Sequence, residues 1–216
     1  MLDSIIRETA EKPNAAIIWL HGLGADGYDF ADVIPELNLP QNSAVRFIFP
    51  HAPVMHITVN GGYEMRAWYD ITDLHLDRDP DIKNIEGNSK YVAELVDAEI
   101  EKGINSERIL LIGFSQGGVM ALQTAIHYPK KLAGVASLSS YFPTADTMPK
   151  DGINAKIPIF FGHGDHDNVV PPALGQKAFE FFKANGNPVE RYTYHMMHSV
   201  CIEELRALGK WIANVF

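Results

Sequence analysis

Ser115 lies in a pentapeptide whose spacing is typical of a serine nucleophile. The sequence Gly113-Phe114-Ser115-Gln116-Gly117 follows an apolar run and precedes a helical pattern. In a tight strand-to-helix turn of this kind the serine hydroxyl stands above the sheet, and the flanking glycines avoid a clash. Free N–H groups at the helix N-terminus favour negative charge there. The motif predicts that Ser115 attacks a carbonyl carbon; a plain helix N-cap is the alternative.

A histidine base for Ser115 is expected later in the chain. A serine hydroxyl is a weak nucleophile until a base takes its proton, and in this kind of site the order is serine, acid, histidine. Five histidines follow Ser115: His127, His163, His166, His195 and His198. His198 lies between the last predicted strand and the last predicted helix, whereas His195 lies within the strand pattern and is expected to pack or face solvent. We therefore predict His198 as the base.

The acid is expected in the segment His163-Gly164-Asp165-His166-Asp167, which leaves a predicted strand. Asp165 and Asp167 are both well placed, and the residue pattern does not separate them. One would orient the imidazole through its Nδ1–H, and the other would stabilise the turn. Two histidines and two aspartates so close together are also compatible with a metal site. Their order does not match a dinuclear hydrolase, so we predict no metal.

A glycine-rich turn supplies a candidate oxyanion hole. The sequence from His21 to Gly27 follows the first confident strand and contains three glycines. Such a turn aims a backbone N–H at the developing oxyanion, and the residue after the nucleophile supplies a second. We assign these two donors to Leu23 and Gln116.

Apolar runs and helical patterns alternate along the chain. The predicted strands span residues 15–20, 45–49, 109–114, 134–138, 157–161 and 189–195. Several are apolar at nearly every position, as expected for strands covered on both faces. Apolar stripes predict helices over residues 92–103, 116–128, 172–185 and 201–215. The alternation predicts an α/β fold with a mostly parallel sheet.

Residues 51–88 show little periodicity and many Pro, Gly, Asp and Asn residues. We interpret them as an ordered loop region beside the site, because a long irregular stretch in a compact domain is usually functional. Met55, Met65, Trp68 and Tyr69 are our candidates for an acyl-binding wall. No linker divides the chain, so we expect one domain over residues 1–216.

Composition argues against several classes of partner. A formal net charge of −9 without a Lys/Arg cluster argues against nucleic acid. There is no apolar run of about eighteen residues and no secretory signal in residues 1–13, so we expect no stable membrane insertion. The single cysteine, Cys201, suits a reducing compartment, so the cytoplasm is expected. A homodimer through exposed apolar residues of the loop region is a further hypothesis.

Six sequence blocks together resemble the phospholipase/carboxylesterase family of α/β hydrolases, which includes bacterial carboxylesterases and acyl-protein thioesterases. The blocks are I-W-L-H-G-L-G-A-D-G (18–27), F-I-F-P-H-A-P (47–53), M-R-A-W-Y-D (65–70), G-F-S-Q-G-G (113–118), H-G-D-H-D-N-V-V-P (163–171) and M-M-H-S (196–199). They occur in family order over nearly the whole chain. The resemblance implies an α/β-hydrolase fold without a large separate lid domain.

The resemblance also implies roles for residues. It gives a triad of Ser115, Asp167 and His198, and so selects Asp167 over Asp165. It places the Leu23 turn at the oxyanion hole, and it implies no metal and no organic cofactor.

The same resemblance places the Trp68 loop beside the substrate cleft. Asn168 stands where several family members have Pro or Asp, a loop change that leaves the triad intact.

The expected function is cleavage of carboxylic esters with short to medium acyl chains, and also of thioesters, through an acyl-enzyme on Ser115. The alternatives are a lysophospholipase or acyl-protein thioesterase as the main activity, or a catalytically silent binding protein of the same fold. The complete set of nucleophile, acid, base and oxyanion turns argues against the silent protein.

Overall fold

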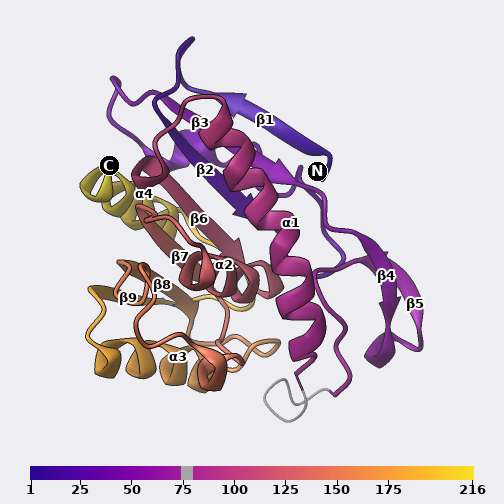
Figure 1. The fold of residues 1–216 in the computed structure, drawn as a ribbon. Coiled ribbons are helices and arrows are strands. Elements are labelled where there is room, and N and C mark those ends of the chain that lie inside the picture. The colour runs from indigo at the N-terminus through magenta and orange to yellow at the C-terminus, as the bar shows by residue number, and fades with distance from the viewer. Residues whose placement is uncertain (74–79) are drawn as a thin grey trace.

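The computed structural model describes residues 1–73 and 80–216 and contains a seven-stranded sheet (Figure 1). The strands are β1 (Ser4–Glu8), β2 (Ala15–Leu20), β3 (Val45–Pro50), β6 (Ile109–Phe114), β7 (Gly134–Leu138), β8 (Ile159–Gly164) and β9 (Val189–Tyr194). Their spatial order is β1-β3-β2-β6-β7-β8-β9, and every neighbouring pair except β1 and β3 is parallel. The predicted α/β-hydrolase architecture with a mostly parallel sheet is confirmed.

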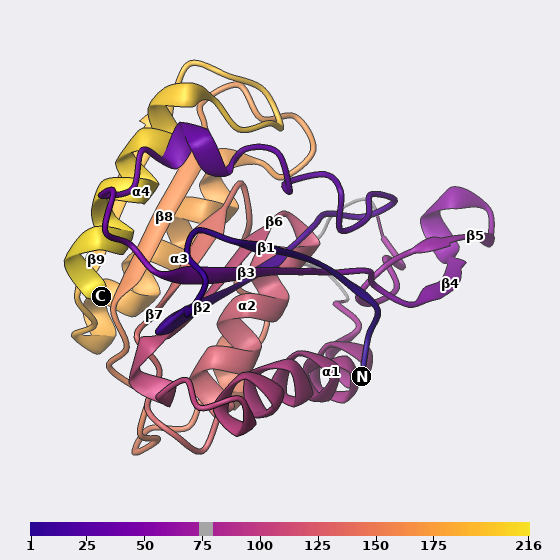
Figure 2. The same ribbon diagram turned by 90° about the horizontal axis from the view of Figure 1, so that it is seen from above.

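Helices cover both faces of this sheet (Figures 1 and 2). Among the described residues the α-helices are α1 (Ile82–Glu101), α2 (Gln116–His127), α3 (Pro172–Asn185) and α4 (Ile202–Val215). One hydrophobic cluster joins α1, α2 and α3 to one face, and a second joins α4 to the other. Across residues 1–73 and 80–216 no separate lid domain covers the sheet, and no helix is long and apolar enough to cross a membrane.

Strand β2 is apolar at every position because each of its faces meets a helical layer. In β2 all six residues are buried. Ile17 and Trp19 pack in the cluster with α4, whereas Ile18 and Leu20 pack in the cluster with α1 and α2. Each fully buried side chain of this size contributes about 1.5–3 kcal/mol relative to an exposed one. This packing fixes the carboxyl ends of β2 and β6, from which two parts of the site project.

The region of residues 51–88 is more regular than predicted. Strands β4 (Val54–Ile57) and β5 (Tyr63–Arg66) form an antiparallel hairpin that stands apart from the main sheet (Figures 1 and 2). Helix α1 begins at Ile82, well before the predicted start at residue 92. The prediction of a continuous loop is therefore wrong for both segments, while residues 74–79 lie outside the described residues.

Strand β8 also differs from its prediction. It begins at Ile159 and continues to Gly164, because the whole segment pairs in register with β9 from Ile159↔Val189 to Gly164↔Tyr194. His163 is therefore a strand residue rather than part of the following loop. The extension of β8 to Gly164 sets the direction of the side chains in the segment that follows the strand.

Helix α4 carries a buried carboxyl group on its sheet-facing side. Glu204 is fully buried, and neither of its carboxylate oxygens has a hydrogen-bond partner among the described residues. Its side chain lies against Gly162 of β8, where an added Cβ would approach Glu204 Oε1 to 2.1 Å. Burial raises the pKa of Glu204 to about 8. The group is therefore a neutral carboxylic acid at neutral pH.

Glu204 should make the protein less stable as the pH rises. Between its ordinary pKa of about 4.3 and the raised value, the unfolded chain releases a proton that the folded chain keeps, so the free energy of unfolding falls by at most about 1.4 kcal/mol per pH unit. Urea unfolding at pH 5, 6.5 and 8 measures this slope. Glu204→Gln should flatten it, whereas Glu203→Gln, at an exposed neighbour, should not. Equal slopes in parent and Glu204→Gln would contradict a neutral buried acid.

Candidate active site

Ser115 occupies the predicted sharp turn between β6 and α2. Its backbone has φ 55° and ψ −122°, a conformation rare outside glycine. A Cβ on Gly113 would lie 2.0 Å from the carbonyl oxygen of Gly117, which explains the glycine two positions before the serine. The Ser115 N–H donates to the Leu138 carbonyl of β7 at 2.9 Å. The neighbouring strand thus holds the turn in place, and the hydroxyl lines a pocket.

His198 and Asp167 form a short hydrogen bond. His198 Nδ1 lies 2.7 Å from Asp167 Oδ2, and Asp167 is buried. Because an ionised carboxylate only accepts, Nδ1 carries the hydrogen and Nε2 remains free to take a proton. His198 and Ser115 line the same pocket, with no hydrogen bond between them among the described residues. Such catalytic bonds are often long without substrate and shorten when it binds.

Asp167 is held in its ionised form by its surroundings. Burial alone would raise the pKa of this carboxyl, but hydrogen bonds from His163 and His198 and from the Val170 and Val169 N–H groups outweigh it. Oδ1 accepts from the Val169 N–H at 2.9 Å and from the Val170 N–H at 2.8 Å. The net effect holds the pKa of Asp167 well below its usual range. A fixed negative charge is therefore available to stabilise an imidazolium on His198.

His163 is a site residue that sequence reasoning did not select. It is buried, and its Nε2 lies 2.9 Å from the Val170 carbonyl and 3.5 Å from Asp167 Oδ2. Since a carbonyl only accepts, Nε2 carries the hydrogen and points between the two oxygens. The only sequence signal was its position in the H-G-D-H-D segment. His163 therefore approaches the same oxygen of Asp167 that His198 contacts.

Asp165 is directed away from this pair. Its carboxylate is about half-exposed and lies 3.7 Å from His166 and 3.6 Å from His195. The two aspartates that the residue pattern could not separate thus have different surroundings. Only Asp167 contacts His198.

The glycine-rich turn after β2 is positioned by a buried histidine. His21 Nε2 accepts from the Ala52 N–H at 3.1 Å, so its Nδ1–H donates to the Gly22 carbonyl at 2.7 Å. Burial lowers the pKa of His21 to about 4, which keeps the ring neutral. Leu23 and Gln116 both line the Ser115 pocket. Within the described residues no acceptor pairs with the N–H of either, so both donors are available to an oxyanion.

The Gln116 side chain ties the nucleophile turn to the segment after β5. Its Oε1 accepts from the Trp68 N–H at 3.1 Å, and its Nε2 donates to the Tyr69 carbonyl at 2.8 Å. The Trp68 indole N–H in turn donates to the His21 carbonyl at 2.8 Å. These bonds connect three segments that are distant in sequence, and they fix the floor of the site.

The pocket beside Ser115 has a volume of about 230 Å³ and mainly apolar walls. Of the four residues predicted to form an acyl-binding wall, only Tyr69 lines it. Trp68 is fully buried beneath the site, and Met55 and Met65 pair with each other across the β4–β5 hairpin. The lining residues that the sequence did not indicate include Ile71, Phe114, Tyr141, Val169 and Val170.

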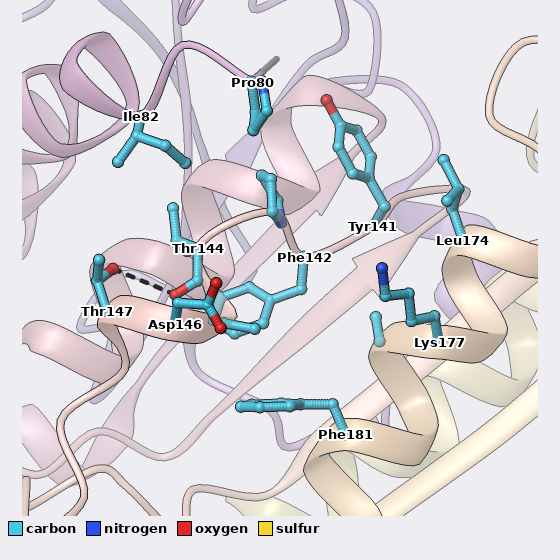
Figure 3. Close-up of a pocket in the computed structure, with 13 residues that line it drawn as sticks. Pro80, Ile82, Tyr141, Phe142, Thr144, Asp146, Thr147, Leu174, Lys177 and Phe181 are labelled. Carbon is cyan, nitrogen blue, oxygen red and sulfur yellow. Dashed lines mark hydrogen bonds between the residues drawn. The ribbon is translucent and has the colours of Figure 1, made fainter. Parts of the chain in front are cut away.

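A second cavity of about 410 Å³ adjoins this pocket at Tyr141, which lines both. Figure 3 shows it between α3, which carries Leu174, Lys177 and Phe181, and the segment from Tyr141 to Thr147. Its walls combine aromatic and aliphatic side chains with Lys177 and Asp146.

Comparison with known proteins gives consistent matches over the whole chain. The family described as Phospholipase/Carboxylesterase matches residues 2–216. Acyl-protein thioesterase 1 of Neurospora crassa is 40% identical over 214 residues, covering 94% of this chain and 87% of the relative. Its namesake of Saccharomyces cerevisiae is 38% identical, covering 91% and 90%. The crystal structure of Zea mays acyl-protein thioesterase 2 has a TM-score of 0.86 and 29% identity, covering 100% of this chain and 99% of that one.

The different surroundings of the two aspartates lead to a direct test. Asp167→Asn replaces the carboxylate that faces His198, so kcat on p-nitrophenyl butyrate should fall by about two to four orders of magnitude. Asp165→Asn is the matched change two residues earlier, and its kcat should stay within about threefold of the parent because its side chain faces solvent. A comparable loss in both variants, with both folded by circular dichroism, would contradict the assignment of Asp167.

Proposed function

Since this chain belongs to the phospholipase/carboxylesterase family of α/β hydrolases, we propose that it acts chiefly as a thioesterase that releases long acyl chains from protein or peptide thiols. The chain is a hydrolase of esters and thioesters. The Asp167–His198 pair lies beside Ser115 in an apolar pocket, and this arrangement is the main support for the proposal. The relatives named acyl-protein thioesterase favour thioesters over simple esters as the main substrates.

The proposed chemistry is acyl transfer through Ser115. His198 Nε2 takes the hydroxyl proton as Oγ bonds to the thioester carbon, and the Leu23 and Gln116 N–H groups stabilise the oxyanion. As the C–S bond breaks, His198 returns the proton to the leaving sulfur. Water then attacks the acyl-enzyme with the same base and releases the carboxylic acid. Each oxyanion donor in such a site is worth about 2.7–4 kcal/mol of barrier.

The two cavities suggest where a long acyl chain would lie. At about 230 Å³ the Ser115 pocket is smaller than the roughly 300–1,000 Å³ of typical ligand sites. A long chain would therefore continue past Tyr141 into the adjoining cavity between α3 and the Tyr141–Thr147 segment. A second candidate function, carboxylesterase activity on short to medium acyl chains, is favoured by the small volume of the Ser115 pocket alone.

We also propose that residues 1–216 form one domain, because both hydrophobic clusters pack on opposite faces of one sheet. The single Cys201 is compatible with the cytoplasm as its location.

The proposed function is tested with a palmitoylated cysteine peptide and its matched serine oxyester. We expect kcat/KM on the thioester to exceed that on the oxyester by at least about tenfold, because a thiolate is the better leaving group. Release of free thiol measures the first reaction, and release of palmitate measures the second. Ser115→Ala should abolish both activities and also labelling by a fluorophosphonate probe.

Two results would contradict this proposal. Rapid cleavage of p-nitrophenyl butyrate without cleavage of the palmitoyl thioester would favour the carboxylesterase. If the fluorophosphonate probe did not label the folded parent protein, the result would favour a catalytically silent binding protein.

The position of Ile71 predicts how chain length is selected. Ile71 is partly buried in the wall of the Ser115 pocket, so Ile71→Trp should obstruct a long acyl chain more than a short one. We expect the ratio of kcat/KM for palmitoyl over butyryl substrates to fall by at least about tenfold, the scale of a steric change in an apolar pocket. Met55→Trp, on the hairpin outside the pocket, is the control. An unchanged ratio in Ile71→Trp would contradict this wall.

A further inference from the structure

Three side chains of types that can bind metal ions converge on the surface beside the candidate active site. Asp165 and His166 follow β8, and His195 follows β9. His166 Nε2 lies 3.0 Å from His195 Nδ1, Asp165 Oδ1 lies 3.7 Å from His166 Nε2, and Asp165 Oδ2 lies 3.6 Å from His195 Nδ1. All three residues are exposed, and their ligand atoms lie within 4.8 Å of one another. None of the three is part of the Asp167–His198 pair.

We propose that Asp165, His166 and His195 form a binding site for a Zn²⁺ ion. Bonds of about 2.0–2.1 Å around tetrahedral zinc place its ligand atoms roughly 3.3–3.4 Å apart. The two nitrogens are 3.0 Å apart, and each lies 3.6–3.7 Å from a different Asp165 oxygen, so rotations of the side chains must bring one oxygen near both nitrogens to close the site. Two imidazole nitrogens with one carboxylate oxygen are a ligand set that zinc accepts, and water completes the tetrahedron.

The backbone already holds these ligands together. The Asp165 N–H donates to the Tyr194 carbonyl at 2.9 Å, and the His166 N–H donates to the Met196 carbonyl at 3.2 Å. A Cβ on Gly164 would lie 2.3 Å from the Met196 carbonyl oxygen, so the two chain segments meet at backbone distance. Metal binding would therefore order only side-chain rotamers, which reduces its entropic cost.

The sequence prediction of no metal concerned a different grouping. It treated the two histidines and two aspartates of residues 163–167 as one set. The structure directs His163 and Asp167 inward and Asp165 and His166 outward. His195 completes the outward group from the segment after β9, and this proximity cannot be read from spacing along the chain.

At this position a bound zinc ion would stabilise the folded protein. The ligands come from the two segments that continue to Asp167 and to His198. A bound ion would cross-link these segments at their exposed side and favour the folded arrangement by linkage. This inference does not depend on the proposed function, because it concerns residues outside the Ser115 pocket.

Zinc binding to tag-free protein, stripped with EDTA and then dialysed, tests the site. Calorimetric titration with zinc alone should show one ion per chain, and Co²⁺ should give the visible absorption of tetrahedral coordination. His166→Ala and His195→Ala should each weaken zinc binding by at least about tenfold. His56→Ala removes an exposed histidine on the β4–β5 hairpin and should bind zinc like the parent. Zinc should raise the melting temperature of the parent and of His56→Ala, but not that of His166→Ala or His195→Ala.

Other outcomes would overturn the site. Equal zinc affinity in the parent and in His195→Ala would place the metal elsewhere, and loss of binding in His198→Ala alone would place it at the active site. No heat of binding and no Co²⁺ absorption at millimolar metal would show that the cluster is only a solvated polar surface. Ser115→Ala should bind zinc normally, so a failure of the proposed function and a failure of this site are distinguishable.

Discussion

The backbone of Ser115 is the constraint on which the rest of the site depends. A residue at φ 55° and ψ −122° costs energy that its surroundings must offset. Its N–H is bound by Leu138, and its carbonyl accepts from the Ser140 hydroxyl at 2.7 Å, so β7 and the residues after it hold both sides of the turn. This arrangement requires β6 to be central and β7 to be its parallel neighbour. The order of the strands is thus part of the catalytic geometry.

Two buried carboxyl groups show how local hydrogen bonding decides the charge of this protein. Asp167 and Glu204 are both removed from solvent, and burial favours the neutral form of each. Asp167 accepts two backbone amides and faces two imidazoles, so it remains ionised. Glu204 has no partner among the described residues and keeps its proton to about pH 8. Two buried carboxyl groups therefore have different charges: Asp167 is a fixed negative charge at the site, and Glu204 on α4 is neutral.

The sequence was informative where one physical signal determines the structure. Continuous apolar runs predicted β2, β6 and β7 because those strands meet helices on both faces. The edge strand β1 was missed, because its exposed residues Arg7 and Glu8 interrupt any apolar pattern. The β4–β5 hairpin was missed for the same reason.

Side-chain direction in the site was harder to predict. An aromatic residue in an irregular segment can line a cleft or support it from below, and Trp68 supports it through its indole N–H bond to His21. The residue pattern left Asp165 and Asp167 equivalent, because their difference depends on how far β8 extends. That length is set by pairing with β9, which is a tertiary interaction.

The pairing of β8 with β9 also explains why the buried Asp167–His198 pair lies next to the exposed cluster of Asp165, His166 and His195. Both strands end at the same edge of the sheet, so the segments that follow them are neighbours. His163 near the end of β8 faces Asp167, and Asp167 in the segment after β8 faces His198, while Asp165 and His166 turn outward to His195. The close approach at Gly164 and the backbone hydrogen bonds from Asp165 and His166 therefore fix the spacing of both groups. A change that separates these two segments would disturb the buried pair and the exposed cluster together, although no side chain is shared between them.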